Sequence, residues 1–283
     1  AVVVPINPQY PKRELLLLLQ KSDATYMITS IEEKEKMEQL KVQHVQAMKM
    51  LYVVEGVLPK NTRPIRPRRR DKDDVAMLLF TSGTTGVAKG AMLTHDNIYA
   101  NARDFGTSLQ YGRADRVIAT LPIFHAFALT VVVHAPIIRG ARIIIVPKFS
   151  PQAILDVAKR HEATVFAGVP TMYHFLTQYA IATQRAYDFS TIRVAISGGS
   201  SMPIAMLEAF EQTFQLRVSE GYGLSEASPV TSFNPLDADR IPGSVGVPIA
   251  NVEQKIVDEN GKEVPVGEVG ELIVRGPNVM KGY

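Results

Sequence analysis

Short apolar runs rich in β-branched residues alternate with helical patterns through the middle of this chain. The runs end at glycine or proline, and apolar residues in the segments between them recur at helical spacing. Strands that alternate with helices form βαβ units, which build a mostly parallel sheet with helices on both faces. The sequence therefore predicts an α/β fold. The expected strands begin at Val117, Arg142, Ala163, Ile192 and Leu216.

Start signals mark the expected helices. Ser150 followed by Pro151 predicts a helix start, because serine accepts a backbone hydrogen bond and proline is tolerated in the first turn. Thr94 predicts a second capped start, and residues 202–214 repeat apolar side chains every three or four positions. We therefore expect three helices to begin near these positions.

The C-terminal part has a different pattern. Residues 235–283 contain two strand-like runs separated by Gly- and Pro-rich turns, without a helical pattern. We expect residues 1–234 to form an α/β core and residues 235–283 a small antiparallel, barrel-like lobe. Within the core part, residues 58–74 are rich in arginine and proline and predict a solvated linker, with contact to an anionic surface as the alternative.

Charge and composition exclude several classes of protein. The formal net charge is +3, and the stretch from residue 61 to 74 accounts for all of it with six Arg or Lys against three Asp. The neutral remainder argues against a nucleic-acid partner. The chain has no cysteine, which excludes disulfides and thiolate metal sites. Its longest apolar run, 126–138, is shorter than the roughly 20 residues that cross a bilayer.

The most specific segment follows an apolar run at residues 78–80. Small residues let a backbone curl and present its N–H groups to an anion, while hydroxyls and an ammonium add donors. A Walker A loop is excluded, because Ala88 stands where that pattern requires glycine. The segment predicts a phosphate-binding loop, formed by Thr81, Ser82, Gly83, Thr84, Thr85, Gly86 and Lys89.

Three more polar segments lie at the ends of expected strands. Glu226 offers the oxygen ligand that a hydrated Mg²⁺ needs, close to the aromatic face of Tyr222. Residues 196–203 begin like a hydrolase nucleophile elbow, but Met202 replaces its last glycine. His125 follows a strand end, where sites in open α/β sheets lie. Plain turn chemistry at Tyr222 and a histidine packed against aromatic rings stay open as alternatives.

Together these segments resemble the motifs of the adenylate-forming superfamily. Residues 81–90 match [Ser/Thr]-Ser-Gly-[Ser/Thr]-Thr-Gly-x-x-Lys-Gly at every position. Residues 222–226 match Tyr-Gly-x-Thr-Glu, with Ser225 in place of threonine and its hydroxyl kept. Within the superfamily, the chain is most similar to bacterial long-chain fatty acyl-CoA synthetases.

The resemblance implies roles for individual residues. The loop would contact the ATP phosphates, Tyr222 would stack near adenine, Ser225 would approach the α-phosphate, and Glu226 would bind Mg²⁺. The implied catalytic residues are Lys89, His125, Ser225 and Glu226. Besides the loop, the implied nucleotide site comprises Gly199, Ser200, Ser201, Glu220, Gly221, Tyr222, Gly223 and Ser225. The implied acyl pocket comprises His125, Val169, Pro170, Thr171, Gly198, Gly223 and Gly246.

The resemblance also implies a reaction. A long-chain fatty acid would react with ATP to give an acyl-adenylate and pyrophosphate, and the thiol of coenzyme A would then displace AMP, with Mg²⁺ as the cofactor. Alternatives are an aryl-CoA ligase, an amino-acid adenylation domain and a non-catalytic nucleotide- or acyl-binding module. An amino-acid activator needs an acidic partner for the substrate amine, and residues 120–129 and 167–176 contain none.

Further expectations concern the limits of the chain and its surroundings. The chain opens with AVVVPINP, which looks like the middle of a buried strand. We expect a fragment of a larger N-terminal domain, without its C-terminal catalytic lobe and with little ligase activity of its own. The resemblance implies a cytoplasmic location. A peripheral contact with the inner face of the membrane and a homodimer are further expectations.

Overall fold

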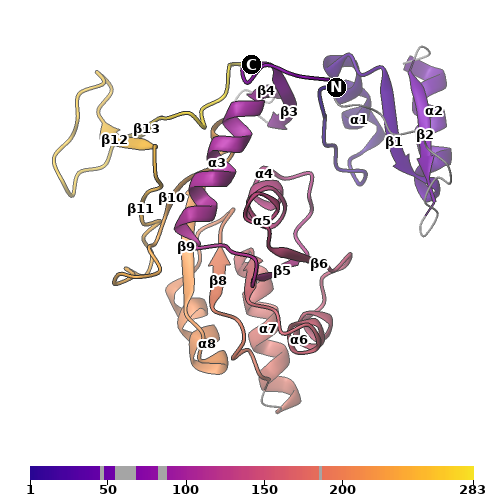
Figure 1. Ribbon diagram of the computed structural model, residues 1–283. Coiled ribbons are helices and arrows are strands. Elements are labelled where there is room, and N and C mark those ends of the chain that lie inside the picture. The colour runs from indigo at the N-terminus through magenta and orange to yellow at the C-terminus, as the bar shows by residue number, and fades with distance from the viewer. Residues whose placement is uncertain (45–47, 55–67, 82–87, 185–186) are drawn as a thin grey trace.

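A seven-stranded sheet forms the centre of the molecule (Figure 1). The computed structural model describes residues 1–44, 48–54, 68–81, 88–184 and 187–283. Strand order in the sheet is β11-β10-β9-β8-β7-β5-β6. Strands β5 to β9 pair in parallel, while β10 and β11 pair antiparallel at one edge. The prediction of a mostly parallel α/β sheet is therefore confirmed. The strands of this sheet are β5 (Arg116–Ala119), β6 (Arg142–Ile145), β7 (Val165–Gly168), β8 (Val194–Ser197), β9 (Val218–Gly223), β10 (Val230–Phe233) and β11 (Val247–Pro248).

Helices cover both faces of this sheet, which explains the continuous apolar runs of its strands. Every residue of β7 and β8 is buried. On one face, Phe105 and Val131 belong to the same buried cluster as Val165. On the other face, Tyr173 and Phe210 pack with Phe166. The helices are α3 (His95–Ser108), α4 (Ala126–Ala128) and α5 (Ala135–Arg139) on the first face, and α6 (Pro151–Arg160), α7 (Pro170–Thr183) and α8 (Ile204–Phe214) on the second.

The three expected helix starts are confirmed. The Oγ of Ser150 accepts a hydrogen bond from the Ala153 amide at 3.2 Å and caps α6. Thr94 caps α3 by accepting from the Asn97 amide at 3.1 Å, while the Asn97 side chain accepts from the Thr94 amide at 2.9 Å. This reciprocal pair is a capping box and fixes where α3 begins.

The apolar run at 126–138 forms one helical segment rather than a membrane span. Between α4 and α5 its backbone is π-helical over η2 (Leu129–His134). Inside η2, the Thr130 hydroxyl donates to the Ser228 carbonyl at 2.8 Å in a buried contact. Such π-helical turns often occur next to functional sites. None of the helices in the described ranges is long and apolar enough to cross a bilayer.

An antiparallel hairpin of β3 (Val75–Thr81) and β4 (Lys89–Thr94) stands apart from the main sheet. Both ends of the chain attach to it. Val3 forms an isolated parallel bridge with Met77, and Gly282 forms an antiparallel bridge with Met92. The expectation that the opening run is a buried strand is wrong, because Val3 makes only this bridge and is 53% exposed.

Two smaller units flank the sheet. The first contains the parallel pair β1 (Tyr26–Ser30) and β2 (Lys49–Val53) with the helices α1 (Lys12–Ser22), α2 (Lys34–His44) and η1 (Ile31–Glu33). The second is the antiparallel pair β12 (Glu253–Val257) and β13 (Glu271–Arg275), which agrees with the antiparallel lobe expected there. Because β11 also pairs with β10 of the main sheet, the division at residue 234 stays a prediction.

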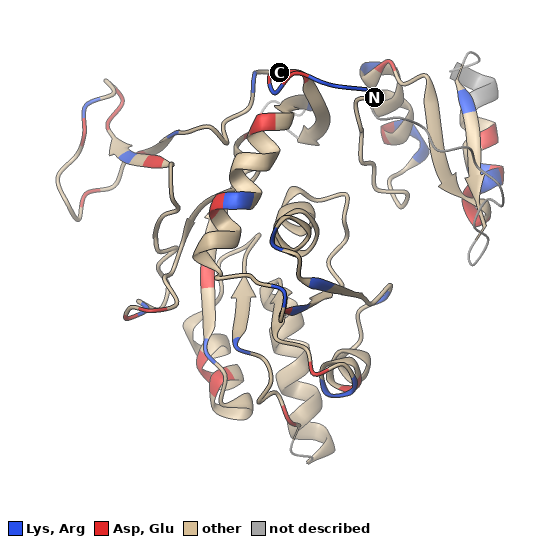
Figure 2. Cartoon of the chain, viewed as in Figure 1, with Lys and Arg blue, Asp and Glu red and all other residues tan. Residues whose placement is uncertain are grey.

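Charged residues of both signs occur on α3 and α6, whereas α7 and the central strands β7 and β8 carry none (Figure 2). The part of the expected linker at 58–67 lies outside the described residues. Residues 68–73 are exposed and Asp74 is half-buried, and Arg70 lies 4.0 Å from Asp74 as a surface ion pair. The expectations of a cytoplasmic location, a membrane contact and a homodimer stay predictions.

Candidate active site

The parallel strands deliver most of the predicted site residues to one edge of the sheet. His125 follows β5, Val169 follows β7, the segment 198–201 follows β8, and Tyr222 lies at the end of β9. Strand β5 lies between β6 and β7, so the strand order of the sheet reverses at β5. Ligands of open α/β sheets bind at the carboxyl ends of the strands next to such a reversal.

A small cavity of about 60 Å³, which we call the glycine pocket, opens at this edge. Its backbone side is formed by predicted site residues from β8 and β9, and its side-chain wall is aromatic and aliphatic. Among the residues that the structure describes, no charged side chain lines it. The lining comprises Phe105, Phe127, Ile196, Ser197, Gly198, Gly199, Gly221, Tyr222, Gly223, Pro229, Val230 and Phe233.

Two of the predicted glycines permit contacts that no side chain allows. A Cβ atom on Gly223 would lie 2.2 Å from the Pro229 carbonyl oxygen. One on Gly246 would lie 2.1 Å from the backbone of Phe233, and Gly246 also has a φ of +80°. These close approaches hold β9, β10 and the segment before β11 together behind the pocket. The glycines therefore fix the shape of the backbone around the pocket.

Tyr222 and Glu220 lie on β9 but face different surroundings. Tyr222 is 41% exposed, and its carbonyl accepts from the Thr231 hydroxyl at 3.2 Å, so its backbone is fixed while its ring stays accessible. Glu220 is buried, and its Oε1 accepts from the Met202 amide at 3.2 Å. Its Oε2 is buried and accepts no hydrogen bond from the described residues. Glu220 thus joins β9 to the segment that carries Ser200 and Ser201, both exposed.

The other half of the site, which we call the phosphate side, comprises Thr81, Lys89, Ser225, Glu226 and Tyr283. Ser82, Gly83, Thr84, Thr85 and Gly86 lie outside the described residues. Thr81 and Lys89 flank them and are paired across the β3–β4 hairpin. The Thr81 Oγ1 lies 3.4 Å from the Glu226 Oε1, across a sequence separation of 145 residues. The structure thus brings the two strongest motifs of the sequence together.

Glu226 has one oxygen available for a cation. It lies with Ser225 in η3 (Ser225–Ala227), and both residues are partly buried. The Oε1 of Glu226 accepts from Thr81 and from the Tyr283 hydroxyl at 2.9 Å, whereas its Oε2 accepts nothing from the described residues. Mg²⁺ is usually held by one or two carboxylates together with substrate phosphates. Glu226 fits that role, and the described residues contain no richer cluster of acidic or histidine side chains.

The residues predicted for the acyl pocket are spread along the sheet edge. The Val169 side chain would lie 3.6 Å from a Cβ atom added to Gly199. A residue predicted for the acyl pocket and one predicted for the nucleotide site are therefore neighbours there. Pro170 is buried at the start of α7, and Thr171 is exposed. His125 is exposed, with its ring centroid 4.6 Å from that of Phe124. Desolvation by neighbouring atoms lowers the pKa of the His125 imidazole, which favours the neutral form of the ring.

Three residues near the site were missed by sequence reasoning. Tyr283 contacts Glu226 across a sequence separation of 57 residues, and no local spacing in the sequence predicts that contact. Asn278 donates to the Ala227 carbonyl at 2.9 Å and holds η3 from behind. Asn97 donates to the carbonyls of Pro277 and Val279 at 2.8 and 2.9 Å. Asn97 could have been noted as the third residue of the capped helix, but its second role follows only from the fold.

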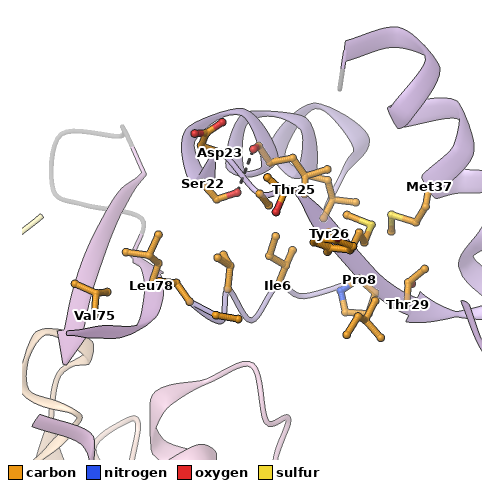
Figure 3. Close-up of a pocket in the computed structure, with 18 of the residues that line it drawn as sticks. Ile6, Pro8, Ser22, Asp23, Thr25, Tyr26, Thr29, Met37, Val75 and Leu78 are labelled. Carbon is orange, nitrogen blue, oxygen red and sulfur yellow. Dashed lines mark hydrogen bonds between the residues drawn. The ribbon is translucent and has the colours of Figure 1, made fainter. Parts of the chain in front are cut away.

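A larger cavity than the glycine pocket lies elsewhere, between α1, β1 and the β3–β4 hairpin (Figure 3). Its volume is about 630 Å³, and its lining is mostly apolar, with Ile6, Leu19, Met37 and Leu78 among its members. None of the predicted site residues that the structure describes lines it. Asp23 is the one charged residue in its described lining, and no lysine or arginine of the described residues lines it, so we place the candidate site at the sheet edge.

The main sheet is mostly parallel and covered by helices on both faces. At the carboxyl ends of its strands lie a pocket lined by glycines and a polar turn that carries Glu226. These features define a class of α/β proteins that bind small ligands at this edge of the sheet. Comparison with known families shows to which family of this class the chain belongs. The chain belongs to the AMP-binding enzyme family, whose profile matches residues 1–283.

Curated relatives include ligases for two kinds of acid. A long-chain-fatty-acid–CoA ligase from Bacillus subtilis is 39% identical over 77% of this chain and 39% of the relative. One from Yersinia pestis is 33% identical over 100% of this chain and 57% of the relative. A feruloyl-CoA synthase from Amycolatopsis is 34% identical over 100% of this chain and 56% of the relative. The chain thus spans about half the length of the curated relatives it matches.

Solved structures agree with the fold. The ATP-bound structure of MatB from Rhodopseudomonas palustris has a TM-score of 0.90 and 30% identity, covering 100% of this chain and 56% of that one. A long-chain-fatty-acid–CoA ligase from Archaeoglobus fulgidus has a TM-score of 0.88 and 27% identity, covering 99% of this chain and 59% of that one. The division of the candidate site among ATP, Mg²⁺ and acyl group is not tested by these likenesses and stays a prediction.

Proposed function

We propose that this chain carries the nucleotide- and acyl-binding part of an acyl-CoA synthetase that activates a long-chain fatty acid with ATP and transfers it to coenzyme A. One observation carries the proposal. Strand β3 ends at Thr81 and strand β4 begins at Lys89, and Thr81 contacts Glu226. The two ends of the predicted phosphate loop therefore lie next to a carboxylate whose Oε2 has no partner among the described residues. Family membership and the ATP-bound relative support the same nucleotide.

The activation step needs two anions to approach each other, the fatty carboxylate and the α-phosphate of ATP. Lys89 supplies a positive charge beside the loop, and Ser225 supplies a hydroxyl in the turn that carries Glu226. Glu226 would hold Mg²⁺, which neutralises phosphate charge when bound. Such fixed donors and charges stabilise the transition state because they need no reorganisation as charge develops.

The remaining site residues would orient the reactants. The exposed ring of Tyr222 offers a flat face for adenine. The lowered pKa of His125 favours its neutral form, in which the ring nitrogens offer one donor and one acceptor to the carboxylate. Once the adenylate has formed, its phosphate is the leaving group, which makes the acyl carbon reactive toward the thiol of coenzyme A.

The lining of the glycine pocket supports an apolar acid. Phe105, Phe127 and Phe233 contribute aromatic surface, and none of the described lining residues is a charged side chain that could pair with the amine of an amino acid. A second candidate substrate is an aryl acid of the feruloyl type. It is supported by the 34% identical feruloyl-CoA synthase and by the same aromatic lining, which would also accept a planar ring.

Thermal unfolding of the chain with non-hydrolysable adenylate analogues tests both candidates. Palmitoyl-, feruloyl- and phenylalanyl-adenylate analogues are compared with AMP alone, which separates nucleotide binding from acyl binding. A ligand present at about 100 times its dissociation constant stabilises the fold by about 2.7 kcal/mol. We expect the largest rise in melting temperature with the palmitoyl analogue.

The largest rise with the phenylalanyl analogue refutes an apolar acid and leaves an amino-acid adenylation domain. A larger rise with the feruloyl analogue replaces the fatty acid with an aryl acid. Equal rises with all analogues and with AMP refute the acyl part of the proposal and leave a nucleotide-binding module. No rise with any of them refutes the proposal for this chain.

A further inference from the structure

Tyr283 lies between the two charged groups of the phosphate side. Its hydroxyl donates to the Glu226 Oε1 at 2.9 Å. The Lys89 Nζ lies 5.2 Å from the centroid of its ring, within the range of a cation–π contact. A single side chain therefore contacts the carboxylate through its polar end and the ammonium through its ring.

Backbone hydrogen bonds on two sides fix the segment that carries Tyr283. On the hairpin side, the Met92 amide donates to the Gly282 carbonyl and the Lys281 amide donates to the Met92 carbonyl, both at 2.9 Å. On the side of η3, the Met280 amide donates to the Glu226 carbonyl at 2.8 Å. Tyr283 is 56% exposed, but the backbone of the residues just before it is held to both motifs that it joins. Its position follows from the fold rather than from loose surface contact.

The charges of Lys89 and Glu226 attract each other, yet the described residues show no ion pair between them. A direct pair would occupy both the ammonium that ATP phosphates need and the carboxylate oxygen that a cation needs. The Tyr283 ring contacts the ammonium while its hydroxyl contacts the carboxylate, so it spaces the two groups. The hydroxyl also holds Oε1 in place, which leaves Oε2 as the oxygen without a described partner.

We propose that Tyr283 is a positioning residue of the phosphate side. Its ring keeps Lys89 and Glu226 from pairing with each other, and its hydroxyl presents Glu226 to the cation through one oxygen. The proposal rests on the proposed function, because it assigns Tyr283 to the binding of a metal–nucleotide complex. The two parts of the side chain have separable effects, which makes the proposal testable.

Two variants separate the ring from the hydroxyl. Tyr283→Phe keeps the ring and removes the hydroxyl, whereas Tyr283→Leu removes both. Binding is measured with Mn²⁺ and ATP by electron paramagnetic resonance of free Mn²⁺, and with ATP alone by equilibrium dialysis. We expect Tyr283→Phe to raise the dissociation constant of Mn²⁺–ATP roughly 5-fold, since it removes one hydrogen bond to a charged, partly exposed group. It should leave the binding of metal-free ATP unchanged.

Tyr283→Leu should weaken both ligands. Without the ring, Lys89 and Glu226 are free to pair, so the ammonium becomes less available to ATP even without a metal. In a Glu226→Gln background, Tyr283→Phe should cause no further loss of Mn²⁺–ATP binding, because the carboxylate it positions is gone. Tyr99→Phe is the matched control, since it removes an exposed hydroxyl on α3 that has no described hydrogen-bond partner.

The outcomes separate this proposal from the proposed function. If the wild-type chain binds neither Mn²⁺–ATP nor ATP, both are overturned. If the wild-type chain binds Mn²⁺–ATP and Tyr283→Phe binds it as tightly, only the role of Tyr283 is overturned. The same holds if Tyr283→Phe weakens metal-free ATP as much as Mn²⁺–ATP, since that pattern indicates a general structural role. If Tyr283→Leu binds metal-free ATP like the wild type, the role of the ring is overturned, while Tyr283→Phe and the double variant decide the role of the hydroxyl.

Discussion

The glycine pocket and the phosphate side lie in the same candidate site but are built differently. The pocket is formed by neighbouring strands whose backbones approach so closely that Gly223 leaves no space for a Cβ atom. The phosphate side is formed by residues far apart in the sequence, which meet through hydrogen bonds at a partly exposed surface. Close packing resists any added atom, whereas hydrogen-bonded contacts at a surface depend on the chemical group that makes them.

This difference predicts two kinds of sensitivity. Substitutions in the glycine pocket should lower the free energy of unfolding, because the core behind them cannot relax around an extra carbon. Substitutions on the phosphate side should change ligand binding while the free energy of unfolding stays nearly constant. A substitution that violated this division would show that the two halves are not independent.

The largest effect is expected for Gly223→Ala. The new Cβ would lie 2.2 Å from the Pro229 carbonyl oxygen, a backbone atom that cannot move aside alone. We expect the free energy of unfolding to fall by about 3 kcal/mol, measured by urea denaturation. Gly112→Ala is the control, because nothing lies within 4 Å of its added Cβ. Equal stability of the two variants would mean that β9 and β10 separate easily at this point.

Local sequence signals predicted the sheet well but not the contacts between motifs. Runs expected at Ala163 and Ile192 became β7 and β8, because continuous β-branched runs encode burial on both faces. The capped starts at Thr94 and Ser150 were also confirmed, since capping depends on residues within one turn.

Other features required the tertiary structure. The contact between Glu226 and Tyr283 depends on how the last segment returns to the hairpin, and hydrophobic periodicity carries no information on that path. The opening run at residues 1–8 is apolar but mostly unpaired in the described residues, because a strand pattern does not guarantee a neighbouring strand.

The second largest effect is expected on binding, for Glu226→Gln. The amide keeps the size of the side chain but removes the charge and weakens the free oxygen as a ligand. Loss of groups that merely support a metal ligand costs about 10- to 100-fold in affinity, so we expect Mn²⁺–ATP binding to weaken at least 10-fold. The urea midpoint should not change. Glu268→Gln, on an exposed turn, is the matched control and should bind like the wild type.

An intermediate effect is expected for Gly198→Ala, where the obstacle is a side chain rather than backbone. The added Cβ would lie 3.0 Å from the Phe127 ring, which has some freedom to shift. We expect a loss of about 1 kcal/mol in the free energy of unfolding and weaker binding of adenylate analogues, because the ring would move within the pocket lining. A second change, Phe127→Leu, should restore part of both losses. If the double variant is no better than the single one, another contact limits this position.

The smallest effect is expected for Ser225→Thr, which gives the phosphate side the residue that the adenylate-forming motif usually carries. Ser225 is partly buried at the start of η3, and its hydroxyl makes no hydrogen bond with a described residue, so one added methyl group displaces no internal partner. We expect ATP affinity to change by less than roughly 2-fold and stability by less than roughly 0.5 kcal/mol. Ser225→Ala, which removes the hydroxyl, should weaken ATP binding by roughly 5-fold.

The two Ser225 variants sharpen the contrast with Gly223, where one added carbon is expected to destabilise the fold strongly. If Ser225→Thr instead destabilised the fold as strongly as Gly223→Ala, the phosphate side would be governed by close packing too.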